Sequence, residues 1–146
     1  MIIDSKDLSI PFVTNISTKI IFGNNAFDDI GKICNNYGNS VLLVTGQSSI
    51  KNNRVDFIKT ELKYWKINFC SYNNVSSDPT VHHINDIIEI GIKNNSNIII
   101  GLGGGSVIDA AKAAAIVLKQ GGKVEDYLTN KISVKDSSIP LIAIPT

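Results

Sequence analysis

The run IIIGLGGGSVIDAAKA, residues 98–113, has the composition and spacing best suited to a chemical role. Three consecutive glycines, Gly103, Gly104 and Gly105, stand between a strand-like apolar run and a helical pattern. Since glycine has no Cβ, amide groups at the helix start can approach a pyrophosphate closely, and the helix dipole favours its negative charge. The pattern therefore predicts a phosphate-binding turn, while a tight strand-to-helix turn capped by Ser106 remains the structural alternative.

Three polar residues, Ser106, Asp109 and Lys112, follow the glycines at helical spacing. Ser106 and Asp109 lie three apart, as in a capping box with Asp in place of Glu, so Asp109 could close the helix start as well as lie beside a ligand. Lys112 falls on the same helical face and could reach a phosphate or pair with Asp109. The surface pair is the simpler expectation.

Short β-rich runs alternate with helical stretches along the chain, and this order would position the glycine run. The predicted strands are residues 18–22, 40–45, 66–71, 97–101 and 140–144. Helical patterns cover residues 26–33, 50–64, 81–91 and 107–119, with a short helical turn at 124–128. Solid apolar runs are typical of strands buried on both faces. We predict one domain over residues 1–146, an α/β fold with an open, mostly parallel, Rossmann-like sheet and helices on both faces.

Composition excludes several kinds of partner. The chain of 146 residues has 14 basic and 13 acidic side chains and no polybasic run, which argues against nucleic acid or an anionic membrane surface. No stretch reaches the ~20 apolar residues of a membrane span and no signal-peptide pattern is found, so we expect a cytoplasmic protein. Cys34 and Cys70 are isolated, and we expect both to be buried small apolar residues.

The adjacent histidines His82 and His83 are poor candidates for metal ligands. Neighbouring residues lie about 100° apart on a helix, whereas two ligands on one helical face need a spacing of three or four. We expect both at a helix start or facing solvent.

The segment GGGSVIDAAKA, preceded by a buried strand and followed further along by PLIAIPT, closely resembles the nucleotide-binding half of the iron-containing (group III) alcohol dehydrogenase family. The segments TKIIFGNNAFDDIG, SVLLVTGQSSI and VSSDPTVHHINDIIEIG are similar to further family segments, so the resemblance covers about residues 10–146. It implies a metal-dependent, NAD(P)-linked enzyme that interconverts alcohols and aldehydes or ketones. The GGGSxxD pattern disfavours the related dehydroquinate synthases.

By this resemblance, the cofactor pyrophosphate would be bound by Gly103, Gly104, Gly105 and Ser106, with Asp109 beside the cofactor and Thr146 beginning a threonine-containing segment that contacts it. The family's metal ligands, one Asp and three His, belong to a helical C-terminal domain that this sequence does not contain. The divalent metal, iron or zinc, would therefore bind only in that missing domain. No catalytic or metal residue is carried over, and the fragment alone is expected to be inactive.

Position 46 departs from some relatives, which place there an Asp that accepts hydrogen bonds from the adenosine ribose. A carboxylate ~4 Å from a 2′-phosphate would cost on the order of 4 kcal/mol at an effective dielectric of about 20. Gly46 removes that repulsion, and Ser48 could donate to the extra phosphate, so we expect both to lie at the ribose and either NADP or NAD to bind. Alternatively, Gly46 only makes a turn.

Two expectations concern the whole molecule. The substrate of the full-length protein would be a small alcohol or aldehyde, whereas a stand-alone nucleotide-binding module without catalytic activity is the alternative function. We also expect a homodimer. The predicted strand around Ile20 and Ile21 would lie at a sheet edge, and the face covered by the missing domain would expose apolar groups.

Overall fold

A single parallel sheet flanked by helices forms the structure, a computed structural model that describes residues 18–23, 27–47, 53–135 and 137–146. In chain order the elements are α1 (Ile30–Asn35), β1 (Ser40–Gly46), α2 (Asn53–Tyr64), β2 (Asn68–Val75), α3 (Val81–Lys93), β3 (Ile98–Gly103), α4 (Gly105–Gln120), α5 (Val124–Leu128) and β4 (Leu141–Pro145). No helix within these ranges is long and apolar enough to cross a membrane.

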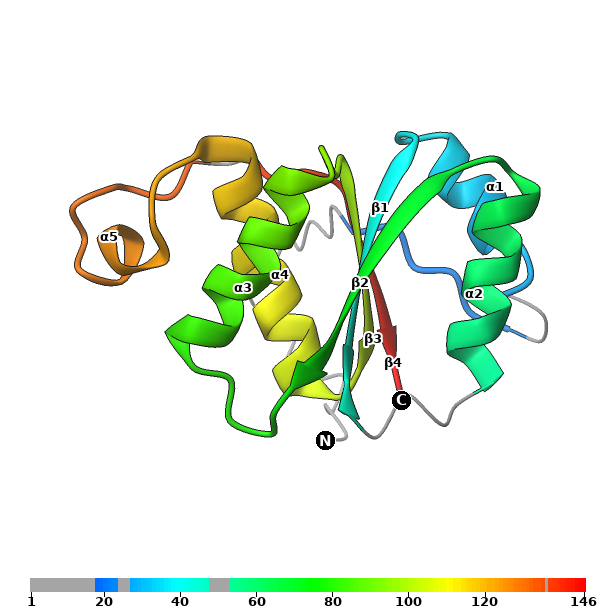
Figure 1. Cartoon of the computed structure of the whole chain (residues 1–146), viewed down its shortest axis with the longest axis horizontal. Helices are drawn as coiled ribbons and strands as arrows, with labels where there is room; N and C mark the ends of the chain where they lie inside the picture. Colours follow the sequence, from blue (N-terminus) through cyan, green and yellow to red (C-terminus); the bar gives the residue numbers. More distant parts are fainter. Residues whose placement is uncertain (1–17, 24–26, 48–52, 136) are drawn as a thin grey trace, which may run out of the picture.

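The strand order is β2-β1-β3-β4, and every neighbouring pair is parallel. Leu42 of β1 lies opposite Cys70 of β2 and Ile99 of β3, which places β1 and β3 at the centre. Helices α1 and α2 cover one face and α3 and α4 the other (Figure 1). The predicted α/β fold with an open parallel sheet is confirmed. Because the chain leaves β1 toward one edge and β3 toward the other, the topological switch point lies between these two strands.

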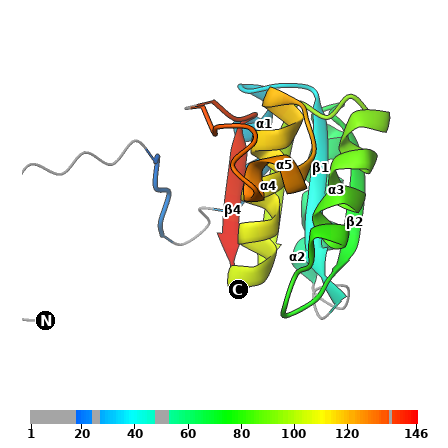
Figure 2. The same cartoon turned by 90° about the vertical axis from the view of Figure 1, so that its left-hand side faces the viewer.

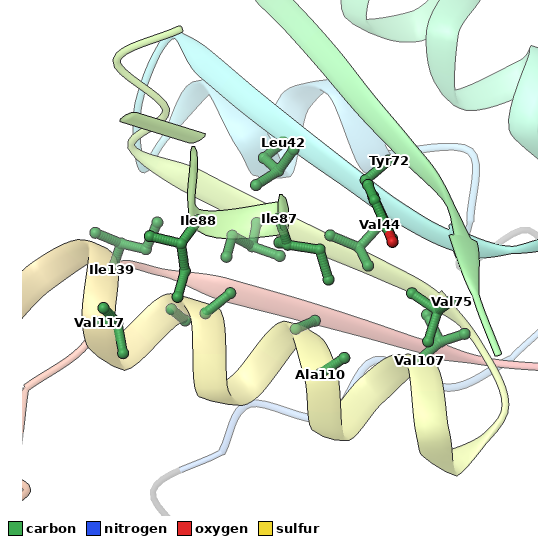
Figure 3. Close-up of a cluster of buried hydrophobic side chains, with 14 of the residues drawn as sticks. Leu42, Val44, Tyr72, Val75, Ile87, Ile88, Val107, Ala110, Val117 and Ile139 are labelled. Atoms are coloured by element: carbon green, nitrogen blue, oxygen red, sulfur yellow. The ribbon is translucent and has the colours of Figure 1, made fainter. Parts of the chain in front are cut away.

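The face covered by α3 and α4 owes its close packing to small residues. Helix α4 places Ala110, Ala111, Ala114 and Ala115 against the sheet, all essentially buried. A Cβ on Gly101 of β3 would lie only 3.1 Å from the Cβ of Ala111, so helix and strand approach as closely as side chains allow. Figure 3 shows Val75 and Val107 together at one end of this core and Val117 and Ile139 at the other.

The opposite face is filled by larger aliphatic side chains. Leu43, Ile58, Leu62 and Ile100 are completely buried there, and each contributes roughly 1.5–3 kcal/mol by leaving water. Cys34 of α1 belongs to the same cluster, and burial raises the pKa of its thiol to about 11. It is a small apolar core residue, as predicted, whereas Cys70 is only partly buried.

The strand predicted at residues 18–22 is wrong. This segment forms no strand, and Ile20 and Phe22 expose 73% and 98% of their surface. Figure 2 shows residues 18–23 running apart from the sheet. A β-branched run becomes a strand only where another strand completes its hydrogen bonds, and no described strand pairs with this one.

The remaining elements differ from prediction mainly at their ends. Helix α1 begins at Ile30, later than predicted, and α4 begins at Gly105, two residues earlier. Strand β2 continues to Val75. The first residues of the helix predicted at 50–64 lie outside the described ranges, as do residues 24–26. Helix α4 ends before Gly121, whose φ of +76° suits glycine, and the short helix at 124–128 is confirmed.

Candidate functional site

The glycine turn is one residue long. Strand β3 ends at Gly103, α4 begins at Gly105, and Gly104 alone separates them as the helix N-cap. The amides of Val107 and Ile108 both donate to the Gly104 carbonyl oxygen at 3.1 Å, so the N–H groups of Gly105 and Ser106 precede the first bonds of the helix. No side chain in the described part of the chain caps them. The turn is therefore tighter than predicted, and its free N–H groups mark the positive end of a 16-residue helix.

Positions 103, 104 and 105 are glycine for different physical reasons. A Cβ on Gly103 would lie 2.7 Å from Cγ2 of Val107, and its φ is +158°, so packing and backbone both require glycine there. A Cβ on Gly104 or Gly105 would meet no atom of the described residues within 4 Å, and both residues are exposed. The fold does not need these two to lack side chains. Their absence leaves open space over the helix start, which is what a pyrophosphate bound by backbone amides requires.

Other predicted site residues lie at the same edge of the sheet. The amide of Thr146 donates to the Gly103 carbonyl oxygen at 3.3 Å, which fixes the end of β4 beside the turn. A Cβ on Gly46 of β1 would lie 3.2 Å from the Val75 carbonyl oxygen and 3.5 Å from Cγ2 of Val107. The carboxyl ends of β1, β3 and β4 and the start of α4 thus meet at the switch point (Figure 1).

Ser48 lies outside the described residues. Gln47, which precedes it, donates through its side-chain amide to Oδ1 of Asn74 near the end of β2. This link between two strand ends is a contact that sequence reasoning missed, because nothing in either segment identifies its partner.

Ser106 is not the helix cap. It is the second residue of α4, and its Oγ donates a hydrogen bond to the Ser77 carbonyl oxygen at 2.6 Å. The capping interpretation is wrong because Gly104 takes the cap position. The sequence carried no signal for the Ser77 contact, because the acceptor is a backbone carbonyl oxygen, which every residue has.

The expected surface pair beside the turn is confirmed. Nζ of Lys112 lies 3.1 Å from Oδ1 of Asp109, and both side chains are mostly exposed. Asp109 makes no capping bond to the start of α4. Its carboxylate remains at the solvent-facing side of the helix, one turn beyond the glycines.

The two histidines also lie where predicted. His83 forms a capping box at the start of α3, where the Thr80 amide donates to its Nδ1 at 3.1 Å. The side chain of His82 is 84% exposed, and its Nδ1 lies 3.8 Å from Oδ1 of Asp86.

Asp86 also acts on Tyr72 of β2. Burial of Tyr72, together with the charge of Asp86 and a hydrogen bond to it, raises the pKa of Tyr72. Across the part of the chain that the structure describes, no three His, Cys, Asp or Glu side chains gather to hold a metal ion.

Two hollows lie away from the glycine turn. The larger, about 450 Å³, lies between α3 and the segment before α5 and includes Ile88, Ile92 and Lys123. The smaller, about 150 Å³, lies between α2 and strands β1 and β2 and includes Thr45, Asp56 and Lys59. Neither hollow includes Gly103, Gly104 or Gly105. The candidate site is therefore an open surface at the carboxyl ends of the strands.

Residues 17–146 match the model of the family described as iron-containing alcohol dehydrogenase. The chain belongs to the iron-containing alcohol dehydrogenase family. Its sequence is 35% identical over 118 residues to the long-chain primary alcohol dehydrogenase AdhA of Thermoanaerobacter ethanolicus, covering 80% of this chain and 30% of that protein. It is 32% identical over 136 residues to NADH-dependent butanol dehydrogenase A of Clostridium acetobutylicum, covering 92% of this chain and 35% of that one.

Solved structures of iron-containing alcohol dehydrogenases share the fold. The NADH-dependent butanol dehydrogenase A of Thermotoga maritima superposes with a TM-score of 0.82 at 29% identity, over 93% of this chain and 34% of that one. The chain thus spans about a third of the length of the relatives it matches and corresponds to their N-terminal portion.

Proposed function

We propose that residues 1–146 are the dinucleotide-binding domain of a metal-dependent, NAD(P)-linked alcohol dehydrogenase that interconverts alcohols and aldehydes or ketones. The observation that carries the proposal is the unobstructed start of α4 at the switch point of the sheet, where Gly104 and Gly105 leave space that no side chain of the described residues fills.

The proposed binding mode divides the cofactor among strand ends. The N–H groups of Gly105 and Ser106 donate to the pyrophosphate, and Gly103 keeps the turn tight enough for them to point outward. Thr146, held next to Gly103, and Asp109 border the same opening. Gly46, at the end of β1, lies at the adenosine ribose. When bound, the nicotinamide supplies hydride transfer, and the chain supplies its position.

The nucleotide preference is part of the proposal. Relatives in Clostridium acetobutylicum and Thermotoga maritima are named NADH-dependent, which supports a nicotinamide dinucleotide in this chain. Gly46 places no carboxylate at the ribose, so we propose that NADP binds at least as well as NAD.

Substrate and metal belong to the whole protein. The names of the relatives support a small alcohol or aldehyde as substrate. A divalent metal, iron or zinc, would act there as a Lewis acid on the substrate oxygen, and the described residues of this chain gather no ligand set for it. We propose that the chain by itself binds nucleotide and has no dehydrogenase activity.

The test is a calorimetric titration of this chain with NADPH, NADH and AMP, the last of which has the adenosine and one phosphate but neither the pyrophosphate nor the nicotinamide. Both dinucleotides should bind and AMP should bind more weakly, because it does not reach the start of α4. Equal affinity for AMP and NADPH would contradict the pyrophosphate site, and no binding of either dinucleotide would contradict the function.

We also propose a homodimer, supported by the exposed apolar segment that contains Ile20 and Phe22. Sedimentation at increasing concentration should show a dimer or larger species, and the double substitution Ile20→Ser and Phe22→Ser should shift the population toward the monomer. Tyr37→Ser, which removes another exposed aromatic residue, serves as the control. A wild-type chain that stays monomeric at high concentration would contradict the proposal.

A further inference from the structure

The loop of residues 76–80, which joins β2 to α3, is held against the first turn of α4 by a single side chain. Oγ of Ser106 donates to the Ser77 carbonyl oxygen at 2.6 Å. Inside the loop, Oγ of Ser76 donates to the Asp78 carbonyl oxygen at 2.8 Å. Among the residues with a described structure, no other hydrogen bond joins residues 76–79 to α4 or to the sheet.

This loop begins beside the glycine turn. Val75, the last residue of β2, pairs with Gly46 of β1. A Cβ on Gly46 would contact both the Val75 carbonyl oxygen and the Val107 side chain, so the end of β2 and the first turn of α4 meet at this point. Figure 3 shows Val75 and Val107 next to each other. The exposed residues that follow Val75 therefore border the same opening as Gly104.

The hydroxyl of Ser106 has one hydrogen, and the Ser77 carbonyl oxygen receives it. What this hydroxyl still offers is lone pairs, which repel phosphate oxygens. Its backbone N–H remains at the uncapped helix start. A direct bond from Oγ to a pyrophosphate would require the Ser77 bond to break.

We infer that Ser106 is a positioning residue whose hydroxyl fixes the 76–80 loop as one wall of the dinucleotide site, while phosphate contact comes from backbone N–H groups. This inference rests on the proposed function. A wall that is ordered before binding saves the ligand the entropic cost of ordering it, so losing the bond weakens binding without removing any phosphate contact.

The test compares Ser106→Ala, Ser106→Thr and the distant control Ser137→Ala in this chain. Calorimetry gives the affinity for NADPH, hydrogen exchange of the peptide covering residues 75–80 reports the loop, and the urea midpoint reports global stability. Ser106→Ala should weaken NADPH binding about five-fold, the effect of one neutral hydrogen bond. It should also speed hydrogen exchange in the 76–80 loop of the free protein. Ser106→Thr, which keeps the hydroxyl, should keep the wild-type affinity and the wild-type exchange rate, and Ser137→Ala should change neither quantity.

Each other outcome overturns the inference in a recognisable way. Weaker binding with unchanged loop exchange would make the hydroxyl a direct ligand. Faster loop exchange with unchanged affinity would show that the loop is no wall of the site. Exchange that rises across the whole sheet with a lower urea midpoint would show a structural role only. A wild-type chain that binds no NADPH would overturn the proposed function itself, before any substitution is compared.

Discussion

Glycines at the strand ends serve two separate needs. Gly103 is required by the fold, because a Cβ there would collide with Val107, whereas Gly104 and Gly105 have space for side chains that they lack. Gly46 is intermediate, since a Cβ would lie 3.2 Å from the Val75 carbonyl oxygen and force a small shift. A glycine that the fold does not need is the one whose replacement should affect binding and spare stability.

Gly46→Asp should shift nucleotide preference toward NAD by about 1–3 kcal/mol, because a carboxylate at the ribose repels a 2′-phosphate and solvent screens part of that repulsion. Gly46→Ala is the matched control, since it adds the same Cβ without the charge. Calorimetric titration of both variants and wild type with NADP and NAD measures the difference.

Wild type should bind NADP at least as well as NAD, and the Ala variant should keep that order. A strong wild-type preference for NAD, or an Asp variant with the wild-type preference, would show that position 46 does not read the ribose.

At the scale of single residues, helical spacing predicted a contact between neighbours on one helix but not a contact between distant segments. The Asp109–Lys112 pair followed from helical spacing alone. The partner of Ser106 did not, because Ser77 is 29 residues away and the loop between β2 and α3 has no pattern that identifies its neighbour. A hydroxyl near a helix start predicts a cap that accepts from a backbone N–H, whereas here tertiary packing lets it donate to the Ser77 carbonyl oxygen.

The two ends of the strands differ in their hydrogen bonding. At the carboxyl ends the backbone around the glycine turn is left open, whereas at the amino ends the Asn97 side chain joins the chain before β1 to the chain before β3. Its Oδ1 accepts from the amides of Asn39 and Ser40 at 3.2 and 3.0 Å, and its Nδ2 donates to Oδ1 of Asn39 at 3.0 Å. This amide completes the hydrogen bonds of the chain entering β1.

Asn97→Ala should lower the free energy of unfolding by about 1–3 kcal/mol, because two backbone amides lose their acceptor at a partly buried position. Affinity for NADPH should not change, since the substitution lies at the opposite edge from the glycine turn. Urea denaturation and calorimetry measure the two quantities.

The control is Asn85→Ala, which removes one exposed hydrogen bond to Glu125 and should cost less than about 0.5 kcal/mol. An Asn97 variant as stable as the Asn85 variant would contradict the role of the Asn97 amide.

Elements with a buried side were predictable, and the segment without one was not. Strands β1 and β3 are buried at every position, as their solid apolar runs predicted. Residues 18–22 have the same β-rich composition but no described strand beside them, so local propensity gave a false strand. Helix α4 begins at Gly105, two residues before the predicted start, because glycine is an adequate N-cap and the preceding strand ends at Gly103.

At the scale of the whole molecule, the position of the site follows from strand order. A parallel sheet ordered β2-β1-β3-β4 leaves a crevice only where successive connections diverge, and the glycine turn follows one of the two strands at that point. The alternation of strands and helices predicted the parallel sheet but not this order. The family match over residues 17–146 and the fold shared with the Thermotoga maritima enzyme agree with that architecture.

Calorimetric titration of NADPH into wild type, Gly104→Ala and Gly104→Val tests whether backbone amides at the start of α4 bind the cofactor pyrophosphate. The new Cβ atoms enter space that is open in the fold, and Gly104 has a φ of −72°, which any residue can adopt. The free energy of unfolding of each variant should therefore lie within about 1 kcal/mol of the wild-type value. Affinity should fall stepwise with side-chain size, and Gly104→Val should lose at least about ten-fold, or 1.4 kcal/mol. A folded Gly104→Val variant that binds NADPH as tightly as wild type would contradict the claim.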